Sequence, residues 1–153
     1  MNPLPHSVLF CCDHNATRSP MAEGMMKKLY GTQFYVQSVG VKNELETDGF
    51  AIAVCQEIGV ELGRHRVRSF DELQDWGDDL SGFDLVVALS PAAQRRALEL
   101  TRFFHLAVEY WPILDPTGLG EARDAKLAAY RETRDQIRAR IVERFGLPLQ
   151  AVE

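Results

Sequence analysis

Short apolar runs along the chain alternate with stretches in which apolar residues recur at helical spacing. The first apolar run, residues 8–11, contains no polar position, which is typical of a parallel strand buried on both faces. From Ser19 the spacing becomes helical, and Pro20 fits the first turn, where its missing N–H has no intrahelical partner to lose. The chain therefore begins with a strand, a short polar loop and a helix.

The rest of the chain repeats this alternation. The pattern predicts further strands over 34–39, 83–89 and 105–110, and helices over 47–58, near Asp71, and over 91–100 and 121–145. No internal repeat, low-complexity segment or linker interrupts it. We therefore expect one α/β domain over residues 1–153, an open parallel four-stranded sheet with helices on both faces. Ligands of such sheets bind beyond the carboxyl ends of the strands, where loop 12–18 is expected.

The last predicted helix is amphipathic. Its apolar stripe is expected to pack in the core and comprises Leu127, Tyr130, Ile137, Ile141 and Phe145. Its charged face is expected to lie in solvent and includes Arg131, Arg134 and Arg138.

Composition excludes several classes of partner. The 153 residues carry a net charge of −5 and contain no basic tract, so we expect neither nucleic acid nor a membrane surface as a partner. No run of about 18 apolar residues could span a bilayer, and the first segment, MNPLPHS, does not resemble a signal peptide. A cytoplasmic protein is expected.

The three cysteines, Cys11, Cys12 and Cys55, have no paired spacing, so a disulfide framework is not expected. Adjacent strand residues point to opposite faces, which places Cys11 in the core and opens Cys12 onto the loop. Cys55 falls on the apolar face of helix 47–58 and is also expected in the core. Cys11, Cys12 and His14 lack a second cluster to complete four ligands, so we expect no metal and no other cofactor.

The loop between Cys12 and Arg18 joins the end of a strand to a helix amino terminus, where unpaired N–H groups and the helix dipole favour an anion. We expect phosphate or sulfate to bind there. The same N–H groups and Arg18 should stabilise the thiolate of Cys12, which is the nucleophilic form. The planar guanidinium of Arg18 matches two oxygens of a phosphoryl group.

The segment CDHNATRSPMAE resembles the C-x5-R-S/T loop of the low-molecular-weight protein tyrosine phosphatases and of the arsenate reductases that share their fold. SVG at 38–40 and FDLVVAL at 83–89 resemble further segments of this family, so the similarity extends over most of the chain. The resemblance implies a phosphotyrosine phosphatase I-like fold. It also implies hydrolysis of a phosphorylated protein or a small phosphoryl substrate through a phospho-cysteine intermediate.

The resemblance further implies roles for individual residues. The oxyanion would be bound by the loop residues Asp13, His14, Asn15, Ala16, Thr17 and Arg18. Asp115, in the only Asp-Pro pair, would be the general acid that protonates the leaving group. Asn15 would brace the loop, Ser19 would donate to the thiolate, and His65 would support the asparagine. Without the resemblance, the Asp-Pro pair would be read as a turn, Ser19 as a helix cap and His65 as a surface residue.

Four residues depart from the phosphatase pattern. Thr117 and Gly118 follow the Asp-Pro pair, where these phosphatases carry aromatic residues that flank a substrate ring. Thr17 stands where a second cysteine often protects the nucleophile. Asp13 adds a negative charge next to Cys12, and we expect its side chain to point outwards, away from a dianionic phosphate.

Two alternatives to a phosphatase remain. An arsenate reductase would need an external small thiol, because the segment after the third strand, ALSPAAQRRALEL, contains no resolving cysteine. A non-catalytic anion-binding or partner-binding domain is the other, since a fold does not by itself ensure turnover. A phosphoarginine substrate also stays open, because Ala16 matches neither of the residues common at that position in related enzymes.

Overall fold

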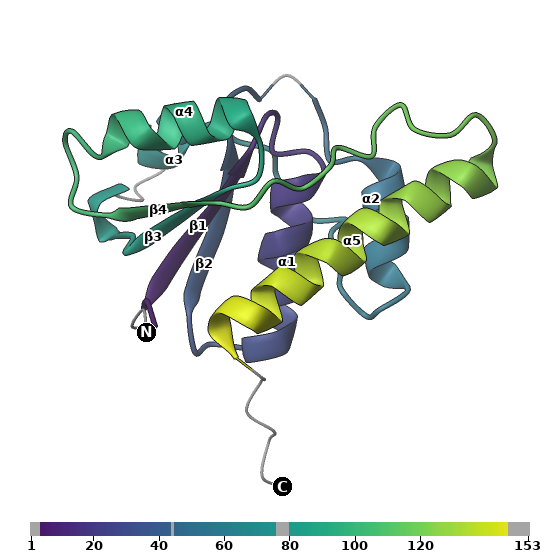
Figure 1. Cartoon of the computed structure of the whole chain (residues 1–153), viewed down its shortest axis with the longest axis horizontal. Helices are drawn as coiled ribbons and strands as arrows, with labels where there is room; N and C mark the ends of the chain where they lie inside the picture. The colour runs from purple at the N-terminus through teal and green to yellow at the C-terminus, as the bar shows by residue number, and fades with distance from the viewer. Residues whose placement is uncertain (1–3, 44, 76–79, 147–153) are drawn as a thin grey trace, which may run out of the picture.

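The computed structural model describes residues 4–43, 45–75 and 80–146. The strands of this part are β1 (Ser7–Cys12), β2 (Tyr35–Gly40), β3 (Leu85–Ala88) and β4 (Ala107–Tyr110). The helices are α1 (Arg18–Tyr30), α2 (Gly49–Gln56), α3 (Phe70–Asp75), α4 (Pro91–Leu100) and α5 (Arg123–Phe145), with a 3-10 turn at Leu80–Gly82. The strands form one parallel sheet in the order β2-β1-β3-β4, which confirms the expected α/β fold (Figure 1).

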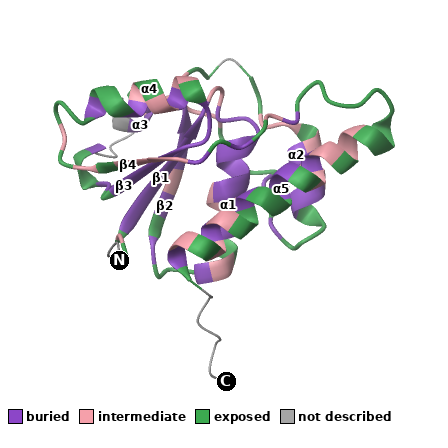
Figure 2. Cartoon of the chain, viewed as in Figure 1, coloured by how far each residue is buried: buried purple, intermediate pink, exposed green. Residues whose placement is uncertain are grey.

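Helices α1, α2 and α5 lie on one side of the sheet, and α3 and α4 lie on the other (Figure 1). Alternate residues of β1 supply the two cores: Val8 and Phe10 pack towards α1 and α5, whereas Leu9 and Cys11 pack towards α3 and α4. All of β1 is therefore buried (Figure 2), which explains why its sequence shows no polar alternation.

The two cysteines expected in the core are buried there, as the pattern indicated. Burial raises the pKa of the Cys11 thiol well above its ordinary value. Burial likewise raises the pKa of Cys55 to about 12. Both thiols are thus protonated at neutral pH, and Cys12 is the cysteine that lines a pocket.

The expectation that Arg134 lies in solvent was wrong. This side chain is buried, and its Nη1 donates to the backbone oxygen of Val54 at 2.8 Å and to Glu57 Oε1 at 2.8 Å. The reason is that α5 packs against α2, where the backbone oxygen of Val54, in the last turn of α2, accepts from Arg134. Hydrogen bonds from Arg131 and Arg134 lower the pKa of Glu57 to about 2.

Because the strands are parallel, their carboxyl ends meet at one edge of the sheet. The loop that follows β1 contains Cys12 to Arg18, the loop that follows β2 ends at Asp48, and the loop that follows β4 contains Asp115. These three loops build the site described next.

Candidate active site

The loop from Cys12 to Arg18 runs from the carboxyl end of β1 into the first residue of α1, as the sequence pattern predicted. Cys12 pairs in register with Gly40 at the end of β2. A Cβ added to Gly40 would lie only 2.6 Å from the backbone nitrogen of Asn15 and from the carbonyl carbon of His14. A glycine at this position therefore allows the loop to pass close over the end of the neighbouring strand.

The thiol of Cys12 lies against the first turn of α1. Its sulfur is 3.0 Å from the hydroxyl oxygen of Ser19 and accepts a hydrogen bond from the backbone N–H of Ser19 at 3.4 Å. The residue is only 3% exposed, yet it lines a pocket of about 340 Å³. The backbone N–H and the hydroxyl group of Ser19 thus both face this sulfur at the amino terminus of α1.

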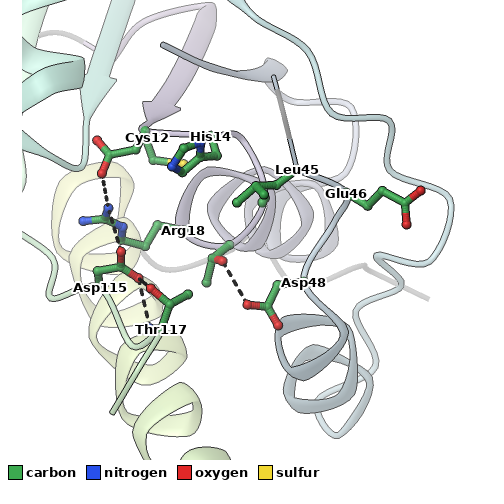
Figure 3. Close-up of a pocket in the computed structure, with 11 residues that line it drawn as sticks. Cys12, His14, Arg18, Leu45, Glu46, Asp48, Asp115 and Thr117 are labelled. Atoms are coloured by element: carbon green, nitrogen blue, oxygen red, sulfur yellow. Dashed lines mark hydrogen bonds and ion pairs between the residues drawn. The ribbon is translucent and has the colours of Figure 1, made fainter. Parts of the chain in front are cut away.

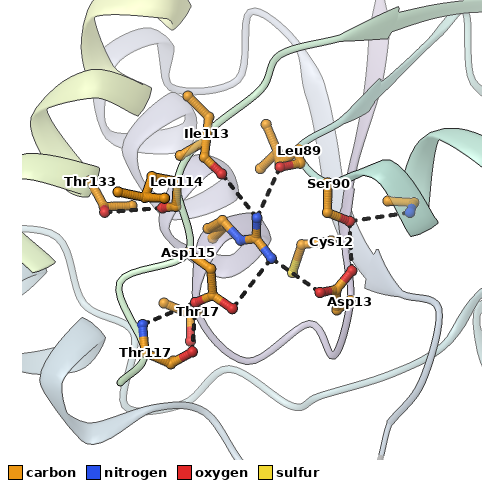
Figure 4. Close-up of polar contacts among 12 residues, drawn as sticks. Cys12, Asp13, Thr17, Leu89, Ser90, Ile113, Leu114, Asp115, Thr117 and Thr133 are labelled. Carbon is orange, nitrogen blue, oxygen red and sulfur yellow. Dashed lines mark hydrogen bonds and ion pairs between the residues drawn. The ribbon is translucent and has the colours of Figure 1, made fainter. Parts of the chain in front are cut away.

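The guanidinium of Arg18 is held by the ends of two other strands. Its Nη1 donates to the backbone oxygens of Leu89 at 3.1 Å and Ile113 at 2.9 Å. Its Nη2 faces two carboxylates, Asp13 Oδ2 at 3.3 Å and Asp115 Oδ2 at 3.6 Å (Figure 4). The structure therefore places Cys12, Arg18 and Asp115 around one pocket, although Asp115 comes from a distant part of the chain (Figure 3).

The expectation that Asp13 points outwards was wrong. Its side chain lines the pocket, and its Oδ1 accepts a 2.7 Å hydrogen bond from the hydroxyl group of Ser90. Its Oδ2 accepts from Arg18. The two donors turn the carboxylate inwards, because an ionised carboxylate is stabilised more by a guanidinium and a hydroxyl than by weak contacts at the loop surface.

Asn15 occupies the centre of a hydrogen-bond network below the loop. Its backbone has a φ of +56°, a left-handed conformation that asparagine tolerates better than most residues. Its amide nitrogen donates to Ser19 Oγ at 2.8 Å and to Ser38 Oγ at 2.9 Å. Ser38 in turn donates to Glu23 Oε1 at 2.6 Å. The side chain of Asn15 thus connects the loop to α1 and β2.

His65 completes this network on the amide oxygen side. Asn15 Oδ1 accepts from the backbone N–H of Arg68 at 3.1 Å and lies 2.9 Å from His65 Nε2. Since an amide oxygen can only accept, Nε2 of His65 carries a proton and donates it. Burial lowers the pKa of His65, and the carboxylate of Glu23 opposes this shift in part.

Asp115 is held by Thr117, which follows the Asp-Pro pair. Its Oδ1 accepts from the backbone N–H of Thr117 at 3.0 Å and from the Thr117 hydroxyl group at 2.8 Å. Its Oδ2 is directed towards Arg18, and 43% of the side chain is exposed. The carboxyl group is therefore oriented into the pocket while it retains access to solvent.

The far wall of the pocket contains residues that the sequence patterns did not single out. Beside Ala16 and Thr17 it includes Leu45, Glu46 and Asp48 (Figure 3). Asp48 precedes α2 and accepts the N–H of Phe50 at 2.8 Å, so an aspartate directly before a helix was the available signal.

Asp48 also accepts the hydroxyl group of Tyr130 at 2.6 Å. Burial and this acceptor raise the pKa of Tyr130, which therefore remains a neutral donor.

Ser90 is another residue that the sequence patterns did not single out. Its Oγ caps α4 by accepting the N–H of Ala93 at 3.2 Å.

Two further observations bear on ligands. Nδ1 of His14 is buried and makes no hydrogen bond to any of the described residues, although the side chain lines the pocket. No group of three or more histidine, cysteine, aspartate or glutamate side chains in the described ranges is placed to hold a metal ion.

No helix in the described part of the chain has the length and apolar character needed to cross a bilayer.

Comparisons with known proteins agree with this geometry. A model of the family described as low molecular weight phosphotyrosine protein phosphatase matches residues 7–146. Arsenate reductase of Bacillus subtilis (strain 168) is 29% identical over 139 residues, which cover 89% of this chain and 92% of that protein. Arsenate reductase 1 of Staphylococcus saprophyticus is 30% identical over 144 residues, with coverages of 92% and 96%.

A similar architecture is found in the crystal structure of the low molecular weight protein tyrosine phosphatase from T. tengcongensis. The TM-score is 0.71 at 26% sequence identity, and the match covers 90% of this chain and 98% of that chain. The similar proteins thus include both phosphatases and arsenate reductases.

Proposed function

Because the chain belongs to the low molecular weight phosphotyrosine protein phosphatase family, we propose that it hydrolyses phosphomonoesters through a phospho-cysteine intermediate. The single observation that carries this proposal is the meeting of Cys12, Arg18 and Asp115 at one pocket, with Asp115 Oδ2 3.6 Å from Arg18 Nη2. A nucleophile, a phosphoryl-binding cation and a proton donor are the three groups that this reaction needs.

In the first step, the thiolate of Cys12 attacks phosphorus and the bond to the leaving oxygen breaks. Arg18 and the N–H groups of the loop hold the equatorial oxygens and stabilise the charge that spreads over them. Asp115, protonated at the start, gives its proton to the leaving oxygen. The products of this step are a free alcohol or phenol and a phosphorylated Cys12.

In the second step, the carboxylate of Asp115 accepts a proton from water, and the water oxygen attacks the phospho-cysteine. The sulfur leaves as a thiolate, which the hydroxyl and backbone N–H of Ser19 stabilise. The half-exposed position of Asp115 suits this step, because the attacking water must reach the carboxylate.

The walls of the pocket suggest which substrates enter it. The described residues that line the pocket include no phenylalanine, tyrosine or tryptophan, and Thr117 stands where the phosphatases that the sequence resembles carry an aromatic residue. We therefore infer a substrate range that is not restricted to phosphotyrosine and that includes other phosphorylated protein side chains and small phosphoryl compounds.

A second function, reduction of arsenate with an external small thiol, is favoured by the names of the two curated relatives. Cys12 would form a bond to arsenic with loss of water. A thiolate would then attack the Cys12 sulfur, arsenite would leave with the electrons of the S–As bond, and a second thiol would release Cys12 from the mixed disulfide. The thiols must come from outside, because Cys11 and Cys55 are buried and, unlike Cys12, do not line the pocket.

A panel of substrates tests both functions: para-nitrophenyl phosphate, phosphotyrosine, phosphoarginine, and arsenate with a small thiol. We expect hydrolysis of para-nitrophenyl phosphate, faster at acid pH, that is abolished in Cys12→Ser. Cys55→Ala serves as a control because it removes a thiol from the hydrophobic core away from the pocket. Arsenate-dependent thiol oxidation without ester hydrolysis would favour the reductase, and phosphate binding without either activity would favour a non-catalytic domain.

A further inference from the structure

We propose that Asp13 weakens the binding of free oxyanions such as inorganic phosphate in the pocket. Its carboxylate competes with an oxyanion for Arg18 and remains beside the bound anion as a fixed negative charge. The inference rests on the proposed function only in taking the loop from Cys12 to Arg18 as the oxyanion site.

The first observation concerns the partners of the two terminal nitrogens of Arg18. Its Nη1 donates to two backbone oxygens, those of Leu89 and Ile113, and is therefore committed to the protein. Its Nη2 is the nitrogen that meets the two carboxylates, Asp13 and Asp115. Of the described residues that line the pocket, Arg18 is the only arginine or lysine, so an entering anion has no other guanidinium or ammonium group to bind.

The second observation is that Asp13 is fixed from behind (Figure 4). Its Oδ1 accepts a hydrogen bond from Ser90 Oγ at 2.7 Å, and Ser90 is itself 1% exposed. Ser90 Oγ also accepts the N–H of Ala93 as the cap of α4. A movement of Asp13 away from the pocket would leave a buried hydroxyl group without its acceptor, which is unfavourable. The carboxylate therefore stays when an anion binds.

The two carboxylates on Arg18 differ in their partners. Oδ2 of Asp115 lies 3.6 Å from Arg18 Nη2 and accepts no hydrogen bond from the described residues, whereas the exposed fractions of the two side chains are similar, 43% for Asp115 and 39% for Asp13. Both oxygens of Asp13 instead accept hydrogen bonds, from Ser90 and from Arg18, and these two donors hold its carboxylate in place. Asp13 is therefore the carboxylate that the protein fixes beside Arg18, whereas Asp115 keeps one oxygen free of hydrogen bonds from the described residues.

A purely structural role for Asp13 makes the opposite prediction. If the carboxylate served to hold Arg18 in place for the anion, its removal would weaken phosphate binding. If it competes with the anion and repels it, its removal strengthens binding, because unit charges separated by one or two hydrogen-bond lengths interact strongly in a partly buried site. The direction of the change therefore separates the two roles.

The test is calorimetric titration of the whole chain with inorganic phosphate at pH 7. We expect Asp13→Asn, which keeps the shape of the side chain, and Asp13→Ser to bind phosphate at least tenfold more tightly than the wild type. Glu46→Gln is the matched control, because Glu46 lines the same pocket but makes no ion pair with Arg18 in the described structure. Its dissociation constant should change less than threefold.

Unchanged or weaker phosphate binding in the Asp13 variants would overturn the proposal. An equal gain in phosphate affinity in Glu46→Gln, or no phosphate binding by any variant, would also overturn it. Two Asp13 variants are used so that loss of folding in either one, seen in a thermal melt, leaves the comparison intact. The titration needs no turnover. A chain that hydrolyses no substrate would refute the proposed function, whereas the dissociation constants decide the role of Asp13 separately.

Discussion

The sulfur of Cys12 lies 3.0 Å from the hydroxyl oxygen of Ser19, which receives a hydrogen bond from Asn15 on its other side at 2.8 Å. The hydroxyl proton of Ser19 can therefore point to the sulfur or to the backbone oxygen of Val39 at 3.3 Å. An ionised sulfur is the stronger acceptor of the two. The network of Asn15 thus orients a donor towards the thiolate.

Ser19→Ala should lower the turnover number about 10- to 100-fold, the effect of losing one hydrogen bond to a charged group. The rate of Cys12 alkylation by iodoacetamide at neutral pH should fall as well, because the sulfur loses its contact with the Ser19 hydroxyl group. Ser38→Ala is the control, since Ser38 binds the same amide of Asn15 without a hydrogen bond to the sulfur. Equal alkylation rates in wild type and Ser19→Ala would contradict this role.

Asp115→Asn should lower the turnover of phenyl phosphate by about 10²- to 10⁴-fold, the usual contribution of a general acid. The loss should be much smaller for para-nitrophenyl phosphate, because nitrophenolate leaves without needing a proton. Initial rates over a series of aryl phosphates measure the difference. A loss that is the same for every leaving group would show that Asp115 acts on Arg18 alone and transfers no proton.

Gly40→Ala should disturb the oxyanion loop directly. Its Cβ would lie 2.6 Å from backbone atoms of His14 and Asn15, so either the loop or the end of β2 must shift, at a cost of about 1–3 kcal/mol. Urea unfolding measures this cost, and turnover should fall further than the loss of folded protein explains. Gly49→Ala is the matched control, because nothing lies within 4 Å of its added Cβ. Wild-type turnover in Gly40→Ala would mean that the loop adapts freely.

The parts of the site that the sequence predicts are local segments. The strand, loop and helix that present Cys12 and Arg18 follow one another in the chain, and their spacing alone indicates a loop at the end of a buried strand. Asp115 needed the resemblance to a family, because nothing in a local Asp-Pro pair says which pocket the loop will reach.

The parts that sequence patterns missed depend on contacts between distant segments. Asp13 turns inwards because Ser90, 77 residues away in the chain, donates to it. Arg134 is buried because it donates to the backbone oxygen of Val54 in α2, 80 residues away. Hydrophobic periodicity predicts which face of an element is buried. It does not predict which polar group of another element will contact that face.

Stability at mildly acid pH should depend on His65. Burial lowers its pKa in the folded chain below the ordinary value of 6.5. Just below that pH, the histidine is therefore protonated more in the unfolded chain than in the folded chain. Folding stability should therefore fall as the pH drops below about 6.5, by less than about 1.4 kcal/mol per pH unit for this one group. His65→Gln keeps an N–H that can reach Asn15 Oδ1 but cannot take up the proton. Urea unfolding at pH 7.5 and 5.5 should show a smaller loss for this variant than for the wild type, and parallel losses in the two proteins would exclude His65 as the source.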